Sequence, residues 1–360
     1  MEEPRAGTLG LAEDLERQRG ILAPRCPPYA RALELLPAVL DGPVRARLEA
    51  AWRGRRFVAF YDRPLLLLAA LRADARAVGP SHPLFSAFCA PAPRLEAVTT
   101  EALALALERE PVLDLVARRS VQTNETTRAV AWLWPAALAG ASGGARPLAL
   151  ADVGASAGLN LVADALAAPW RFADGQAVPV ASDVRAVARL GLDATPLDAG
   201  SREDAGWLRA CVWPGDRERE ERLEAALAAF AAMRTRPDAP LLAPASAGSA
   251  PARLAALSAA HPGALVIAYQ TLLRDYLPPD ERAEYVEGMR AWIAAQPPGQ
   301  ALWMELELAP GDGELPCTLT AHVRAPRGGV RTLVPARCGY HPTVLRPDPT
   351  AVLELQAALC

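Results

Sequence analysis

The stretch LALADVGASAGLNLVADAL, residues 148–166, decides how the chain is interpreted because it fits two incompatible patterns. Its centre, residues 154–158, matches G-x-S-x-G, the strand-to-helix turn that exposes the serine of a hydrolase. Residues 152–158 also match an acidic-x-G-x-small-x-G loop, which holds a nucleotide-type cofactor against a helix N-terminus. Ser156 is therefore either a nucleophile or a side chain small enough to let a cofactor approach the backbone.

The place of this stretch in the chain favours the cofactor loop. In the hydrolase fold the nucleophile follows a middle strand, and an earlier loop of the same sheet supplies the oxyanion hole. Here we find no convincing strand before the stretch and no H-G-G-type loop. Two aspartates and two histidines could complete a Ser…Asp…His order on paper: Asp275, Asp312, His322 and His341. Because any serine followed by so long a chain passes that test, the hydrolase remains the less favoured alternative.

The composition argues against several functions. The 360 residues carry a net charge of −3, so no overall basic field attracts nucleic acid, and we expect no nucleic-acid partner. The chain contains arginine but no lysine, which excludes a P-loop lysine and a Schiff base. The six cysteines form no C-x-x-C pair and the four histidines show no metal-ligand spacing. We therefore expect free thiols and no bound metal.

Nothing in the sequence indicates export or a membrane. The first 20 residues are charged and lack the apolar segment of a signal peptide. The longest apolar run, PLLLLAALRADA (64–75), is too short to span a bilayer. We therefore expect a cytoplasmic protein without a membrane partner.

The pattern of apolar residues changes near residue 146. Residues 1–145 place apolar side chains at three- and four-residue steps, which predicts an all-helical region acting as a lid or acceptor platform. Residues 146–360 alternate short apolar runs with helical segments, which predicts a mostly parallel sheet covered by helices. A helix is expected at 157–167 and an inserted hairpin at 170–183. We expect five parallel strands and a final antiparallel pair, at residues 147–154, 184–195, 239–246, 263–272, 300–308, 316–325 and 330–340.

The cofactor interpretation gives the residues of the loop distinct roles. Gly154 permits the tight turn, Ser156 is small at the point of closest approach, and Gly158 opens the helix beside the strand. Asp152, at the carboxyl end of the strand, is expected to orient loop amides or to meet an amine of the ligand. Asp193, at the end of the second strand, is the acid expected to bind ribose hydroxyls. The alternative is that the two glycines only permit close packing of helix and strand.

Five parallel strands followed by an antiparallel pair are typical of the S-adenosylmethionine-dependent methyltransferase fold. The expected fold class is therefore α/β: a Rossmann-like, methyltransferase-type, mostly parallel sheet with an N-terminal all-helical region. An NAD-binding Rossmann protein is the nearest competitor. It prefers an unbroken G-x-G-x-x-G loop, whereas this chain has Leu159 at the last position of that pattern.

Six stretches carry a family resemblance: RRSVQTNETTRA (118–129), LADVGASAGLNL (150–161), GLDATPLD (191–198), VWPGDRERE (212–220), LVIAYQTLLRDYLPPDER (265–282) and CGYHP (338–342). Together they resemble the bacterial family named domain of unknown function 2332, over about residues 110–345. The resemblance implies a Rossmann-like, methyltransferase-type core without an established substrate. Its most specific parts include the glycine loop together with Leu159-Asn160-Leu161, so Ala155 and Asn160 join the expected cofactor-binding residues.

The chain departs from the pattern of that family at two places. Tyr269-Gln270 stands where a histidine is usual after the fourth strand, and residues 239–246 lack the acid that often follows the third strand to meet adenine. The catalytic residue is therefore unassigned, with Tyr269, Gln270 and His341 as candidates. Arg274 is expected to hold the acceptor or the methionine part of the cofactor. The alternative for Tyr269, Gln270 and Arg274 is ordinary loop packing, and the alternative for His341 is a lone surface histidine without a catalytic role.

Four polar residues precede the predicted sheet: Gln122, Thr123, Asn124 and Glu125. One interpretation is a helix N-cap formed by Thr123 or Asn124. The other is a loop that lies over the glycine loop and helps to close the site around a substrate.

We therefore predict that this protein binds S-adenosylmethionine and transfers its methyl group to a small-molecule acceptor. Methyl transfer needs alignment and at most one base, so the lack of an obvious catalytic residue is tolerable. The rival is a non-catalytic binding module that keeps the fold. The expected cofactor-binding residues are Asp152, Gly154, Ala155, Ser156, Gly158, Asn160 and Asp193.

Overall fold

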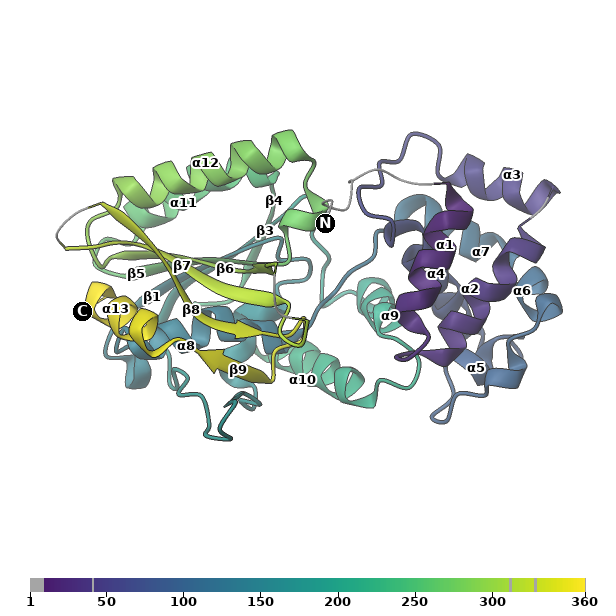
Figure 1. Cartoon of the computed structure of the whole chain (residues 1–360), viewed down its shortest axis with the longest axis horizontal. Coiled ribbons are helices and arrows are strands. Elements are labelled where there is room, and N and C mark those ends of the chain that lie inside the picture. The colour runs from purple at the N-terminus through teal and green to yellow at the C-terminus, as the bar shows by residue number, and fades with distance from the viewer. Residues whose placement is uncertain (1–9, 41, 311–312, 327–328, 360) are drawn as a thin grey trace. The chain divides into compact units, whose positions relative to one another are not determined.

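The computed structural model describes residues 10–40, 42–310, 313–326 and 329–359. The chain forms two compact units (Figure 1), each built from more than one segment. Unit 1 comprises Met1–Thr123 and Arg202–Glu221, and unit 2 comprises Asn124–Ser201 and Arg222–Cys360. The sequence predicts a single boundary after residue 145, whereas the contacts within the chain divide it at three places.

Unit 1 is helical in its described residues. Its core includes the middle of α4, where Leu66, Leu67 and Leu68 are each at most 1% exposed. The buried Arg72 of the same helix donates to the carbonyl oxygens of Phe88 and Arg209, both at 2.9 Å. Its helices are α1 (Leu11–Leu22), α2 (Pro27–Val39), α3 (Gly42–Ala51), α4 (Asp62–Val78), α5 (Phe85–Phe88), α6 (Thr100–Leu107), α7 (Glu110–Arg118) and α9 (Arg202–Cys211), and α10 (Arg217–Met233) begins here and continues into unit 2.

Unit 2 contains a nine-stranded, mostly parallel sheet in the order β2-β9-β8-β7-β6-β5-β1-β3-β4. From β4 to β6 all neighbours are parallel, and from β6 to β9 they are antiparallel. The fold is therefore mixed α/β, and its parallel part has the strand order of Rossmann-like proteins. The strands are β1 (Leu148–Val153), β2 (Arg171–Phe172), β3 (Ala186–Asp193), β4 (Leu241–Pro244), β5 (Leu265–Thr271), β6 (Ala301–Leu308), β7 (Cys317–Arg324), β8 (Val330–Cys338) and β9 (Val344–Pro347).

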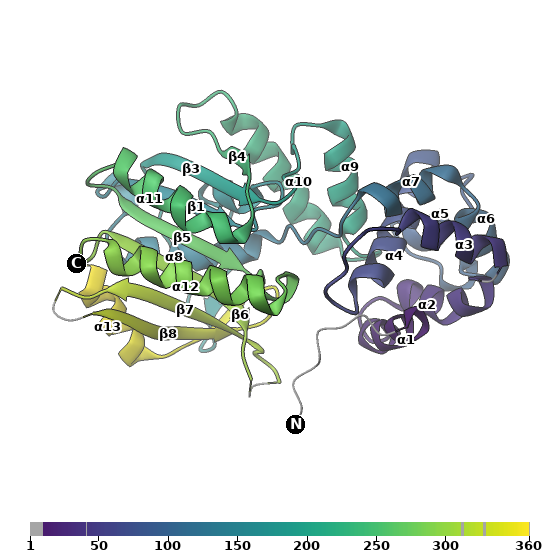
Figure 2. The ribbon, with the colours of Figure 1, turned by 90° about the horizontal axis from the view of Figure 1, so that it is seen from above.

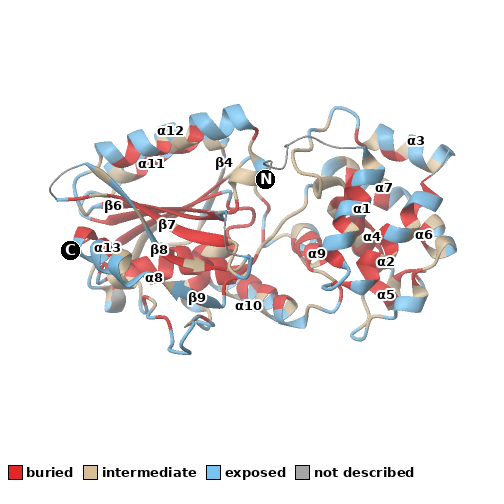
Figure 3. Cartoon of the chain, viewed as in Figure 1, coloured by how far each residue is buried: buried red, intermediate tan, exposed pale blue. Residues whose placement is uncertain are grey.

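Helices cover both faces of this sheet (Figure 2). One face packs against α8 (Val130–Leu138) and α13 (Pro349–Leu359), and the other against α11 (Ala250–Ala260) and α12 (Pro279–Ala295). Strands buried on both faces read as continuous apolar runs, and all six residues of β1 are buried (Figure 3). Although α8 lies in the region predicted to be a separate helical part, its side chains belong to the core of unit 2.

The seven predicted strands are present, but three local features differ from the prediction. The helix expected at 157–167 is a 3₁₀-helix, η4 (Leu159–Ala165), preceded by Gly158 in the left-handed region at φ 70°. The buried Arg189 of β3 donates to two residues of this 3₁₀-helix: the carbonyl oxygen of Leu161 and, at 2.7–2.8 Å, the carboxylate of Asp164. The expected hairpin at 170–183 is present as an antiparallel bridge between Arg171 and Ala177, and the pairing of its strand β2 in parallel with β9 is the part that was not predicted. Neither β9 nor α13 was predicted.

Candidate functional site

The glycine loop lies at the carboxyl end of β1, between β3 and β5. The strand order reverses at β1, and crevices for ligands in open α/β sheets form at such points. Three alternate residues of the loop have a positive φ: Gly154 (83°), Ser156 (54°) and Gly158 (70°). Ser156 is the exception among them, because a left-handed conformation costs a residue with a Cβ atom about 1 kcal/mol. Its conformation is therefore imposed by the surroundings of the loop.

The end of β3 holds this loop. The carbonyl of Leu192 accepts the backbone N–H groups of Gly154 and Ala155, at 2.8 and 3.1 Å. The carboxylate of Asp193 accepts the N–H of Ser156 on one oxygen, at 2.8 Å, and the N–H of Thr195 on the other, at 2.9 Å. Asp193 is only partly buried, and a carboxylate has about four lone-pair positions. Asp193 therefore anchors the loop and can still accept further hydroxyl groups.

The glycines of the loop also have a packing role. A Cβ atom on Gly158 would lie 2.6 Å from Leu242 Cδ2, and one on Gly154 would lie 3.0 Å from Leu273 Cδ1. A Cβ atom added at Gly191 of β3 would lie 2.3 Å from the same atom of Leu242. Close packing therefore accounts for Gly158, whereas Gly154 is exposed at the surface of the loop.

The polar segment before the sheet supplies one contact to the loop. Asn124 donates from Nδ2 to the hydroxyl oxygen of Ser156 at 2.9 Å. Glu125, not Thr123 or Asn124, is the N-cap, and it accepts the N–H of Thr127 at the start of η2 (Thr126–Ala129). Of this segment, Gln122 and Thr123 belong to unit 1.

Glu125 is buried and lies beside two basic groups. Arg222 donates to both of its carboxylate oxygens, at 2.9 and 3.0 Å. The Nδ1 atom of His341 lies 3.7 Å from the same carboxylate, and its side chain is 36% exposed. His341 is therefore the one catalytic candidate of the three with substantial access to solvent, and it lies next to a carboxylate and a guanidinium.

Asp152 is almost completely buried, on the strand position paired with Tyr269 of β5. Removal from water raises its pKa to about 8, and the nearby charge of Asp193 acts in the same direction. The Tyr269 hydroxyl and Arg128 oppose this rise without cancelling it. At a pKa of about 8 the protonated form of Asp152 predominates at pH 7.

Asn160 lies in η4 and is tied to α8 through its backbone. Its carbonyl oxygen accepts the indole N–H of Trp132 at 2.9 Å. Its side-chain Oδ1 is buried and has no hydrogen-bond partner among the described residues. A buried amide oxygen of this kind is free to accept a donor from a ligand.

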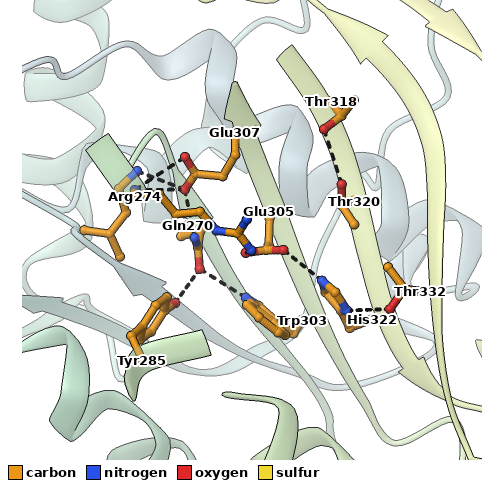
Figure 4. Close-up of polar contacts among 11 residues, drawn as sticks. Gln270, Arg274, Tyr285, Trp303, Glu305, Glu307, Thr318, Thr320, His322 and Thr332 are labelled. Carbon is orange, nitrogen blue, oxygen red and sulfur yellow. Dashed lines mark hydrogen bonds and ion pairs between the residues drawn. The ribbon is translucent and has the colours of Figure 1, made fainter. Parts of the chain in front are cut away.

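The end of β5 leads into a buried polar network beneath α12 (Figure 4). Gln270 is 0% exposed and donates to Glu307 at 2.8 Å. Its amide oxygen accepts the indole N–H of Trp303 at 3.2 Å and the hydroxyl of Tyr285. Tyr269, the neighbouring candidate, is also 0% exposed. Both candidate side chains are therefore part of the interior.

Glu307 fixes the loop that follows β5. It accepts the backbone N–H groups of Leu273 and Arg274 at 3.0 and 3.3 Å. Leu272, just before them, has a φ of 55°, so this turn is strained. Burial raises the pKa of Glu307 to about 7 despite these donors and Gln270.

Glu305 and His322 form a second buried pair, which the sequence analysis did not assign. Glu305 accepts Arg274 at 2.5 Å on one oxygen and lies 2.8 Å from His322 Nε2 on the other. The only sequence signal is the alternation Trp303-x-Glu305-x-Glu307, which places three large or charged side chains on one face of β6. It does not reveal that His322 lies opposite Trp303 on β7.

These contacts bear on the hydrolase alternative. The Ser156 hydroxyl lies against an amide, and the ring nitrogens of His322 face Glu305 and Thr332. Asp312 lies outside the described residues. A serine triad of Ser156 with His322 is therefore absent from this arrangement.

Other features of the described chain lie apart from the loop. A hollow of about 440 Å³ in unit 2 is lined by residues 165–167 and by α10, and one of about 400 Å³ in unit 1 by residues 95–100 and α2. Within the described ranges no three His, Cys, Asp or Glu side chains are grouped to hold a metal ion. Among the described residues we also find no helix with the length and apolar character needed to cross a membrane.

Comparison with known proteins gives one match. The model of a family described as an uncharacterized protein conserved in bacteria, domain of unknown function 2332, matches residues 14–346. No curated protein and no solved structure matches the chain.

Proposed function

The chain belongs to this bacterial family, and we propose that it is a methyltransferase whose unit 2 binds S-adenosylmethionine at the glycine loop and Asp193. The acceptor is a small molecule. When bound, the cofactor supplies an electrophilic methyl group, and the residues of the chain position it and the acceptor.

One observation carries the proposal: the hydrogen bond from Ser156 N–H to Asp193 Oδ2, at 2.8 Å. It brings together the two elements that the sequence paired, a small-residue turn after β1 and an acid after β3. An adenosyl group needs both, a bare backbone for its close approach and a carboxylate for its ribose hydroxyls.

The residues of the loop fit such a ligand in three respects. Gly154 is exposed, so the backbone is accessible where the strand order reverses. Asp193 keeps lone pairs that its two backbone donors do not use. The buried Oδ1 of Asn160 lacks a donor within the described chain. Asn124, through Ser156, would hold the side of the loop that faces the ligand.

The rival is a non-catalytic module with the same fold. Two observations favour it: Tyr269 and Gln270 are fully buried, and the packing against Leu242 is a sufficient reason for Gly158. A binding module needs neither an exposed base nor an acceptor site.

Calorimetry with S-adenosylmethionine and S-adenosylhomocysteine tests the proposal. We expect both to bind the full chain, and Asp193→Ala to abolish binding. Asn124→Ala should weaken binding about tenfold, the loss of one hydrogen bond of about 1.4 kcal/mol, with little change in Tm. Asp174→Ala, in the turn after β2, is the matched control and should bind normally. If neither compound binds, the methyltransferase is excluded; if both bind but no methyl group is ever transferred, the module is favoured.

A further inference from the structure

A hydroxyl, an imidazole and a carboxylate form a chain of hydrogen bonds on the sheet face beneath α12 (Figure 4). Thr332 Oγ1 of β8 is 3.0 Å from His322 Nδ1 of β7, and His322 Nε2 is 2.8 Å from Glu305 Oε2 of β6. We propose that Thr332 is an activated nucleophile that takes an acyl group from a small uncharged ester, with His322 as its base and Glu305 as the positioning residue.

The imidazole is held in one orientation from two sides. The Trp303 ring stacks on it with a centroid distance of 4.1 Å and an interplanar angle of 21°. Glu305 is itself fixed, because its other oxygen accepts Arg274 at 2.5 Å. Nucleophile, base and orienting carboxylate within hydrogen-bond reach define this kind of site whatever their order in the chain.

The accessibility of the three groups suits their roles. His322 and Glu305 are 4% and 3% exposed, whereas Thr332 is exposed. A carboxylate paired with an arginine only accepts hydrogen bonds, so Nε2 of His322 carries the hydrogen and the lone pair of Nδ1 faces the hydroxyl. The base is therefore buried in the correct tautomer and the nucleophile faces solvent.

The surroundings of Thr332 favour an uncharged acyl group over a phosphoryl group. Val330, two residues before it on β8, packs with the cluster that contains Trp303. The adjacent cation, Arg331, pairs with Glu354 of α13, on the opposite face of the sheet, at 3.1 Å. Among the described residues, Arg324 lies on the same face of β7 as His322 and donates to the carbonyl oxygen of Gln296 at 2.9 Å. An anionic phosphoryl group would have to compete with that bond for an arginine.

The proposed step balances without a further reactant. Thr332 Oγ1 forms a bond to the ester carbonyl carbon, and its proton moves to His322 Nδ1. The bond between that carbon and the alcohol oxygen breaks, and the alcohol leaves with the proton from His322. Water then releases the acyl group as a carboxylic acid by the same route in reverse.

The test is acetylation of the full chain by p-nitrophenyl acetate, followed by release of p-nitrophenolate and by mass analysis of peptides. We expect the acetyl group on Thr332 to form at least about 100-fold faster than on Thr343, an exposed threonine on the approach to β9, since a positioned base contributes about that much. Equal rates at the two threonines would overturn the proposal.

Variants separate activation from folding. Thr332→Val should abolish the labelling and Thr332→Ser should keep it; both change an exposed side chain, so the fold is not at risk. His322→Gln should lower the rate about 100-fold. An unchanged rate in folded His322→Gln contradicts the proposal, as does acetylation that falls on Ser156 instead.

The role of Glu305 has its own readout. Glu305→Gln should slow the acetylation of Thr332, whereas Glu305→Asp, which keeps a carboxylate for His322 Nε2, should restore it. A purely structural role predicts that the rate falls in both variants only as far as their Tm falls. Since the assay contains no S-adenosylmethionine, its outcome is independent of the methyltransferase proposal.

Discussion

Two regions of unit 2 bury carboxyl groups in different ways. At the glycine loop, Asp152 is buried with a hydroxyl beside it and takes up a proton, so its pKa is about 8. Beneath α12, Glu305 is buried between Arg274 and His322. Hydrogen bonds from these two side chains offset the cost of removing its carboxylate from water. A fold can thus tolerate a buried acid either by neutralising it or by pairing it. The first needs only burial, whereas the second needs side chains from three separate segments.

The largest effect should come from breaking the paired site. Glu305→Ala leaves His322 and Arg274 without their carboxylate, and loss of one partner from a buried pair costs about 3 kcal/mol or more. Urea unfolding would measure the change in the free energy of unfolding. Asp152→Ala, which removes a neutral acid of similar burial, is the comparison and should cost clearly less; equal losses would erase the distinction between the regions.

The packing of the glycine loop provides the next test. Gly191→Ala would set a methyl group 2.3 Å from Leu242 Cδ2 and 3.0 Å from Ala155 Cβ, and overpacking of this kind costs about 1–3 kcal/mol. Leu242→Ala in the same chain should recover part of the loss. The control is Gly206→Ala on α9, where a Cβ meets nothing and the helix should gain about 0.5–1 kcal/mol.

The protonation of Asp152 predicts a dependence of stability on pH. Its folded pKa is raised from 3.8 to about 8, so its contribution is complete below about pH 4 and is lost as the pH rises through about 8. Asp152→Asn should remove up to about 1.4 kcal/mol per pH unit from the decline in the free energy of unfolding.

Glu307 serves as the comparison for that measurement. Its pKa is raised only to about 7, so the decline that Glu307→Gln removes should end about one pH unit earlier than the decline that Asp152→Asn removes. Identical curves for wild type and Asp152→Asn would show that Asp152 ionises normally in the folded chain.

The smallest effect should appear at the serine itself. Ser156→Gly relieves a left-handed backbone, worth about 1 kcal/mol, and loses the hydrogen bond from Asn124, worth about the same. The free energy of unfolding should therefore change by less than about 1 kcal/mol, as thermal and urea unfolding can establish. A loss well beyond that would mean that the Asn124 contact holds more of the loop than its geometry indicates.

Much of unit 2 could be predicted from sequence because its strands are buried on both faces. Residues 148–151 and 265–268 are short continuous apolar runs, and such runs between turns favour a parallel sheet. The glycine loop could also be predicted, because small residues at this fixed spacing indicate a tight backbone turn after a strand. The short 3₁₀-helix η4 could not be predicted in the same way, because its backbone is bound by the side chain of Arg189, which comes from β3.

The buried network was beyond sequence reasoning for a related reason. Gln270 looked like a residue at the edge of a cleft because it ends a strand, yet Glu307, Tyr285 and Trp303 enclose it. His322 looked like a partner for a distant serine, and the register of β6 with β7 puts it on Glu305 instead.

The sequence alone determined the mixed α/β class, the succession of the main strands along the chain and the glycine loop after the first of them, because periodicity and small residues act through the local backbone. Only the tertiary structure decided which acids are paired, which candidates are enclosed and where the chain divides into units. Those outcomes depend on contacts between residues far apart in the chain, such as Glu125 with Arg222, and no local pattern encodes them.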